Sequence, residues 1–246
     1  MATSRELRNK INSVKNTKKI TRTMEMIATA KSVVCQKRIE AVQPYANKVA
    51  ELLEDLKQAG AGGDEASTKF PLLRVPSKIQ REVLIVLTAN RGLCGGYNTN
   101  TLKLAENHLD QRAREGVEVE VHMVGKKGAA RFRYLGRDVA QVYRQFEDKP
   151  TFAEAEALFE PILERFEKGE IDAVSLVSTR YINAARQRPE KRSILPLSVD
   201  AAEGEESGGH GSTDFIFEPS PEEILGTLVP LTVKMQLFQG LVEAAA

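Results

Sequence analysis

Several residue types are scarce or missing in this sequence, and their scarcity limits the chemistry open to the protein. The 246 residues include no tryptophan, 2 cysteines and 3 histidines. Cys35 and Cys94 lie in unrelated contexts, so they predict neither a disulfide framework nor a metal site. His108, His122 and His210 also lack the spacing of metal ligands. We therefore expect no metal and no cofactor, and a reducing compartment suits the scarce cysteines.

Long apolar runs and catalytic motifs are missing as well. No stretch of about 18 apolar residues occurs, so we expect no helix that spans a membrane, and the N-terminus lacks the apolar segment of a secretory signal. The sequence contains no G-x-S-x-G, H-E-x-x-H or G-K-[ST] motif. Its hydrophobic content of 41% and charged content of 28% are typical of a globular protein. These features predict a protein without a catalytic site of its own.

The sequence does contain a long apolar repeat at its N-terminal end. From Leu7 onward, alternating steps of four and three residues reach a series of mostly apolar positions. These positions are Leu7, Ile11, Val14, Lys18, Thr21, Glu25, Ala28, Ser32, Cys35, Ile39, Val42, Ala46, Val49, Leu53 and Leu56. The repeat predicts one coiled-coil helix of roughly 80 Å, although we expect Pro44 to kink or interrupt it. Such a rod needs a second helix or a partner protein along most of its length.

The middle of this repeat is irregular and basic. Its polar interruptions are Lys18, Thr21, Glu25 and Ser32, and a second stripe, one position earlier, contains Ile20, Met24, Ile27 and Val34. Either the coiled coil is imperfect, or residues 15–32 contact something other than the partner helix. Residues 1–40 carry ten basic and three acidic side chains, a net charge of +7, whereas the whole chain has +1. A basic rod attracts nucleic acid or an acidic protein surface, although a solvated face is the commoner outcome.

Beyond a Gly/Ala/Ser linker at residues 59–69, strand patterns alternate with helix patterns. We expect strands over residues 82–88, 117–124, 138–143, 172–182 and 192–197, and helices over residues 99–114, 126–135 and 152–168. Thr151 and Glu154 predict a capping box at the start of the last of these helices. The alternation predicts an α/β fold, in which a Rossmann-like, largely parallel sheet domain is inserted between the long N-terminal helix and a C-terminal helix.

The predicted organisation has four parts. They are a coiled-coil helix over residues 1–58, the Rossmann-like domain over 70–200, an acidic loop over 201–219 and the start of a C-terminal helix over 220–246. Ser220 followed by Pro221 is typical of a helix start, and we expect Pro230 to kink or restart that helix. Residues 215–217 are a candidate edge strand.

A glycine-rich loop follows the first predicted strand and contains Arg91, Gly92, Gly95 and Gly96. A phosphate site would lie at this point in a nucleotide-binding fold. The spacing is G-x-x-G-G rather than G-x-G-x-x-G, so we interpret these residues as a structural turn in which glycine permits positive φ. A nucleotide-binding Rossmann-like enzyme is one competing hypothesis, and a basic coiled-coil protein that binds nucleic acid is another.

Three segments resemble the gamma subunit of F-type ATP synthase. They are INSVKNTKKITRTMEMIATAK at residues 11–31, NRGLCGGYN at residues 90–98, and STRYIN at residues 178–183 with its following strand SILPL. The first two, in this order, are highly specific, and the similarity covers nearly the whole chain. In that family the terminal helices form an antiparallel coiled coil inside a ring of alternating alpha and beta subunits. The domain between them forms a foot that touches epsilon and the membrane c-ring.

The resemblance implies a non-catalytic rotor that couples proton flow through the c-ring to conformational cycling of the catalytic beta subunits. It implies alpha, beta, epsilon and the c-ring as partners, without nucleic acid or membrane insertion, at the cytoplasmic face of a bacterial inner membrane. By motif match, Lys18, Arg22, Met24 and Met26 are candidates for the rotor–stator contact, with coiled-coil core as the alternative for the two methionines. The family's C-terminal helix runs well past the point that matches Ala246, so we expect a fragment or a short form.

Overall fold

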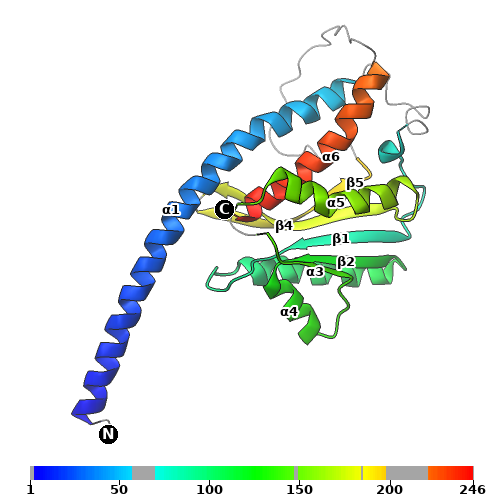
Figure 1. Ribbon diagram of the computed structural model, residues 1–246. Helices are drawn as coiled ribbons and strands as arrows, with labels where there is room; N and C mark the ends of the chain where they lie inside the picture. The colour runs from blue at the N-terminus through cyan, green and yellow to red at the C-terminus, as the bar shows by residue number, and fades with distance from the viewer. Residues whose placement is uncertain (1–2, 57–69, 147–148, 184, 198–220, 246) are drawn as a thin grey trace.

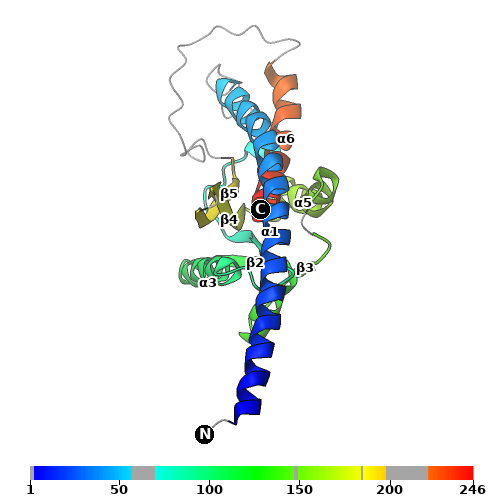
Figure 2. The same ribbon diagram turned by 90° about the vertical axis from the view of Figure 1, so that its left-hand side faces the viewer.

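The computed structural model describes residues 3–56, 70–146, 149–183, 185–197 and 221–245. Its longest element is α1, Ser4–Leu56, a helix of 53 residues whose N-terminal half projects away from the rest of the chain (Figure 1). The C-terminal helix α6, Pro221–Ala245, lies beside the other half of α1 and runs in the opposite direction (Figures 1 and 2).

A five-stranded sheet in the order β3-β2-β1-β4-β5 forms the centre of the fold. Its strands are β1 (Arg81–Leu87), β2 (Glu118–Val124), β3 (Gln141–Tyr143), β4 (Ala173–Asn183) and β5 (Arg186–Leu195). The first four are parallel, whereas β5 pairs antiparallel with β4. The predicted fold class, a largely parallel sheet between two terminal helices, is therefore confirmed.

Helical elements cover both faces of the sheet (Figure 1). They are α3 (Tyr97–Arg114) and α4 (Lys126–Tyr134) on one face, and α5 (Phe152–Glu167), α6 and the short 3-10 turn η2 (Pro71–Leu73) on the other. Successive side chains of a strand point to opposite faces, so Leu84 and Val86 pack in the first layer while Ile85 and Leu87 pack in the second. The capping box of Thr151 and Glu154 that begins α5 is confirmed.

The apolar seam of α1 is buried over only part of its length. Cys35, Ile39 and Val49 are buried against the rest of the protein, and α1 packs on α6 in this region. Leu7 and Val14 in the projecting half are 52% and 67% exposed. The second half of the predicted seam therefore has its helical partner within the described residues, and the first half does not.

Some sequence expectations need correction or cannot be compared. β5 begins at Arg186 rather than at residue 192, because backbone pairing with β4, and not a buried apolar pattern, defines its charged first half. The helix α6 continues through Pro230 as a single element and does not restart there, whereas α1 continues through Pro44 as the one helix that the repeat predicts. The candidate strand at 215–217 and the proposed N-cap Ser220 lie outside the described residues.

Among the described residues, one helix has the length and hydropathy of a membrane span. The stretch is Glu223–Ala245 in α6, with a mean hydropathy of 1.2, and half of its most apolar window is buried inside the protein. Core helices of globular proteins share these properties, and the buried residues Leu225, Val229 and Val233 belong to the core beneath α6. The burial indicates that α6 is apolar because it packs on the sheet.

Candidate interaction site at the long helix and the glycine loop

The four candidate contact residues of α1 lie on its projecting, exposed half. Lys18, Arg22 and Met26 follow one another at intervals of four residues, so they share one side of the helix, and Arg22 pairs with Glu25 at 2.8 Å. Met24 lies on the other side and lines a cleft beside the sheet. The structure thus brings three of the candidates together and separates Met24 from them.

The glycine loop lies at the carboxyl end of β1 and leads directly into α3. Leu93 has a φ of +64° and Gly95 a φ of +56°. Both values lie in the left-handed backbone region, which residues with a Cβ rarely adopt. Gly96 precedes α3, and a Cβ there would lie 2.8 Å from Nδ2 of Asn100. Leu93 is 90% exposed at the tip of the loop, so the loop displays an apolar side chain on a constrained backbone.

Polar side chains fasten this loop to the neighbouring strand ends. The amide of Asn90 donates to the carbonyl of Phe146 at 2.8 Å and accepts from the backbone N–H of Lys126 at 3.0 Å. Asn98 accepts from the backbone N–H of Ala89 at 2.8 Å. These bonds join the segments that follow β1, β2 and β3, so the loop is held as part of one rigid edge of the sheet.

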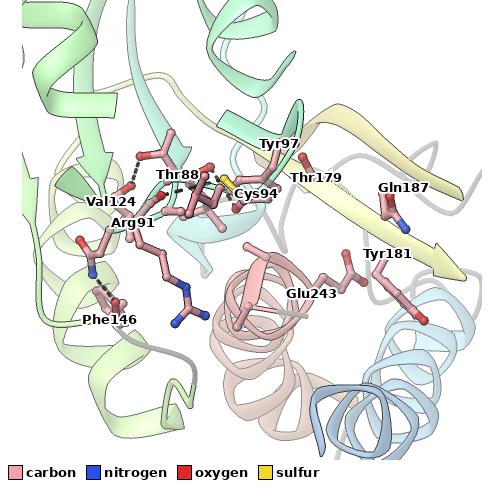
Figure 3. A pocket seen from close by; sticks show the side chains of 18 of the residues that line it. Thr88, Arg91, Cys94, Tyr97, Val124, Phe146, Thr179, Tyr181, Gln187 and Glu243 are labelled. Atoms are coloured by element: carbon pink, nitrogen blue, oxygen red, sulfur yellow. Dashed lines mark hydrogen bonds between the residues drawn. The ribbon is translucent and has the colours of Figure 1, made fainter. Parts of the chain in front are cut away.

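A cleft of about 1060 Å³ separates this edge from α1 and from the end of α6. Figure 3 shows Arg91 extending from the loop toward α6, with Glu243 and Tyr181 on the far side of the cleft. Its charged lining is mostly basic and comprises Lys31, Arg91, Lys126, Arg144 and Glu243. Burial raises the pKa of Glu243, although the charge of Arg192 opposes that effect. The cleft is therefore positive, and it favours an acidic ligand or partner surface.

The tyrosine and the cysteine that line the cleft are both engaged with neighbouring residues. Tyr97 is half-buried, and desolvation of its phenol, followed by the charge of Cys94, raises the pKa of Tyr97, so the hydroxyl stays neutral. The thiol of Cys94 accepts a hydrogen bond from Nδ2 of Asn98 at 3.0 Å. Among the described residues, no group of three or more His, Cys, Asp or Glu side chains is arranged to hold a metal ion.

The residues that fasten α1 to the domain were not predicted from the sequence. Nε2 of Gln36 donates to the hydroxyl of Tyr181 at 2.6 Å, and Nη2 of Arg38 donates to the carbonyl of Pro150 at 3.3 Å. Both Gln36 and Arg38 lie beside the apolar seam. Their polar character gave no signal, because polar residues at such positions are ordinarily solvated.

Comparisons with known proteins agree on one family. The profile of a family described as ATP synthase matches residues 3–246. The chain is 39% identical to the ATP synthase gamma chains of Leptospira biflexa and Gemmatimonas aurantiaca, over 100% of its own length and 82% of theirs. A solved structure from Tetrahymena thermophila, the central stalk and c-ring of mitochondrial ATP synthase, matches at 17% identity with a TM-score of 0.63 over 92% of each chain. That likeness shows a shared fold.

Proposed function

The chain belongs to the ATP synthase gamma-chain family, and on that premise we propose how it works. It acts as the central-stalk rotor that couples proton flow through a membrane c-ring to conformational cycling of the catalytic beta subunits. It performs no catalysis itself. The observation that carries this proposal is the long helix α1, which is anchored to the sheet domain over one half and projects freely over the other.

The projecting half is suited to the interior of a protein ring. Residues 4–31 extend for roughly 40 Å at 1.5 Å per residue, and each of them is exposed. Apolar side chains such as Ile11, Ile20 and Ile27 alternate there with lysines and arginines. A surface of this kind favours burial inside a partner, and alpha and beta subunits supply such a surround in the proposed complex.

The remainder of the chain takes the other roles in this proposal. In this proposal residues 1–58 act as the shaft, residues 70–200 as a foot, residues 201–219 as an acidic connection, and residues 220–246 as a second part of the shaft. The foot contacts epsilon and the c-ring at the cytoplasmic face of a bacterial inner membrane. Torque passes between foot and shaft through the buried seam around Cys35 and Ile39 and through the Gln36–Tyr181 bond.

The test is complementation in native membranes. ATP synthesis driven by a proton gradient is measured in inverted vesicles from cells with and without this chain, and the complex is then purified and its subunits identified. We expect the chain to co-purify with alpha, beta and epsilon, and its removal to abolish synthesis while the alpha and beta subunits persist. Equal synthesis without the chain, or its absence from the complex, would contradict the proposal.

A further inference from the structure

The hairpin of β4 and β5 carries an unusual concentration of positive charge. Five basic side chains and one acidic side chain lie between residues 180 and 192, a net charge of +4, compared with +1 for the whole chain. The basic residues are Arg180, Arg186, Arg188, Lys191 and Arg192. We call the segment from Arg180 to Arg192 the basic hairpin. It lies on one side of α1 and α6 (Figure 2).

Two of these arginines face each other directly. Arg180 on β4 and Arg188 on β5 are partners in the antiparallel register. Residues paired in this way have Cβ atoms about 5 Å apart, and like charges in such a pair destabilise the sheet. Among the residues that the structure describes, neither arginine forms an ion pair, and the same holds for Arg186 and Lys191. The charge of Arg180 does act on Glu243 of α6, but without an ion pair in this part of the chain the repulsion between Arg180 and Arg188 is only partly offset.

The framework of the hairpin is nevertheless firmly held. Tyr181 accepts the hydrogen bond from Gln36 on α1, and Nη2 of Arg192 pairs with Glu243 on α6 at 3.2 Å. The turn is closed by Asn183, whose Oδ1 accepts from the backbone N–H of Arg186 at 2.9 Å. These contacts link the described residues of the hairpin to both helices.

The length of the basic hairpin and its exposed side chains indicate which class of ligand it can bind. The segment from Arg186 to Lys191 is roughly 17 Å long at 3.4 Å per residue, more than one phosphate or carboxylate group can span. The aromatic ring of Tyr181 is half-buried and engaged with Gln36, so the ribbon offers no free stacking surface of the kind that single-stranded nucleic acid uses. Ile182, which is 45% exposed, adds an apolar contact among the arginines. Arginine with an apolar neighbour is a composition typical of protein interfaces.

The edge strand also limits how a partner can bind. β5 is the last strand of the sheet, and Pro189 within it has no N–H to donate to an added strand. A partner therefore meets the ribbon through side chains rather than by extending the sheet. Carboxylates are the complementary groups, because arginine binds them with paired hydrogen bonds.

We propose that the basic hairpin is a docking surface for an acidic polypeptide segment of another subunit of the ATP synthase. This inference rests on the proposed function for the presence of neighbouring subunits. An acidic segment bound there neutralises the Arg180–Arg188 repulsion. It also becomes mechanically connected to α1 through Tyr181 and to α6 through Arg192, so the surface is placed to transmit or resist rotation.

The test is carbodiimide cross-linking of the purified complex, which joins amines to carboxylates without a spacer. The variant Arg188→Lys keeps the positive charge and adds a reactive amine, and Lys191 supplies a natural one. Arg133→Lys is the matched control, since Arg133 is an exposed arginine of α4, far from the hairpin. Mass spectrometry then identifies the carboxylate that is joined to each lysine.

We expect products that join residue 188 or Lys191 to Asp or Glu residues of a different subunit. Raising the salt concentration from roughly 0.05 M to about 1 M should lower their yield about threefold to tenfold, because screening weakens exposed ion pairs. The variant Arg180→Gln/Arg188→Gln should lower the Lys191 product by a similar factor. Position 133 should give no such salt-sensitive product.

Three cross-linking results would overturn the docking surface. They are the absence of inter-subunit products at the hairpin, products that join it only to acidic residues of the same chain, and equal yields at position 133. A complex that contains this chain and synthesises ATP while giving any of these results leaves the proposed function standing. Loss of the chain from the complex refutes the proposed function, and the docking surface with it. Bound nucleic acid that protects the hairpin from reaction until nuclease is added also overturns the proposal.

Discussion

Gln36 on α1 and Tyr181 at the end of β4, 145 positions apart in the sequence, are joined by a hydrogen bond of 2.6 Å. The amide of Gln36 also donates to the hydroxyl of Ser32 one turn earlier, at 3.2 Å. Both residues of the Gln36–Tyr181 pair are half-buried. If one partner were removed, water could therefore restore only part of the hydrogen bonding of the other. This pair provides a polar link between the long helix and the sheet at the point where the helix leaves the domain.

Removal of the Tyr181 hydroxyl should weaken that link without disturbing the ring. We expect Tyr181→Phe to lower the free energy of unfolding by about 1 kcal/mol, the net value of an average hydrogen bond. Chemical denaturation of the purified chain measures the change. Tyr134→Phe is the control, because Tyr134 is 82% exposed on α4 and its hydroxyl forms no intramolecular hydrogen bond among the described residues. Equal stability of both variants and the wild type would show that the bond contributes nothing.

The sequence predicted the elements whose pattern is set by burial. Strand β1 was predicted from an apolar run and β2 from an alternating pattern, and the seam positions Cys35, Ile39 and Val49 are buried as a coiled-coil pattern requires. The start of β5 was missed, because Arg186 and Arg188 lie on an exposed edge where neither burial nor alternation marks a strand. Backbone pairing with β4 determines that strand, and the sequence of one partner carries little information about it.

Only part of the candidate site could be predicted from the sequence. The glycine motif placed a tight turn after β1, since residues with positive φ favour glycine, but Leu93 adopts the same region without any sequence signal. The contacts of Gln36 and Arg38 depend on how α1 crosses the domain. Such long-range docking is a property of the tertiary structure, and no local pattern encodes it.

Glu82 is the basis for a prediction about pH. Its carboxylate is fully buried on β1 and contacts Nε2 of His108 at 2.9 Å and Nε of Arg112 at 2.6 Å. Burial, the largest influence, raises the pKa of Glu82, but the hydrogen bonds of His108 and Ser175 and the charges of His108 and Arg112 together lower it to about 2 from 4.5. Because the folded-state pKa is the lower one, this stabilisation is complete above the unfolded pKa and is lost as the pH falls through the folded value. At 1.36 kcal/mol per pKa unit, the contribution is on the order of 3 kcal/mol.

We therefore expect Glu82→Gln to reduce the free energy of unfolding at neutral pH by on the order of 3 kcal/mol, since the half-buried Arg112 loses its counter-charge and the buried His108 loses its carboxylate partner. The variant should also lose much of the pH dependence of stability between about pH 5 and pH 2. Denaturant titrations across that range provide the measurement, with Glu160→Gln at an exposed position of α5 as the control. If Glu82→Gln lost stability at acidic pH to the same extent as the wild type, this interpretation of the buried cluster would be contradicted.

Gly125 connects β2 to α4 where the backbone comes very close to the end of β1. It has a φ of +100°, and a Cβ at this position would lie 2.1 Å from the carbonyl oxygen of Thr88. We expect Gly125→Ala to destabilise the fold by about 3 kcal/mol or more, because backbone strain and a clash with main-chain atoms add together. Gly116→Ala is the control, since Gly116 also has a positive φ of +73° but no neighbouring atom within 4 Å of the point that an alanine methyl group would occupy. It should cost about 1 kcal/mol, and equal losses in the two variants would exclude the clash as the cause.

Met24 provides the most direct test of the proposed rotor. Its side chain is 43% exposed and lines the positive cleft together with Lys31 and Arg91. A lysine at this position would add a fifth positive charge to the four basic side chains that line the cleft, and a charge is costly to bury where a partner subunit would cover the methionine. We expect Met24→Lys to lower the number of protons pumped per ATP hydrolysed in inverted vesicles, with a smaller effect on hydrolysis itself.

The control is Met24→Leu, which conserves volume and apolar character and should keep normal coupling. A Met24→Lys complex with an unaltered ratio of pumping to hydrolysis would show that Met24 is not part of the rotor contact.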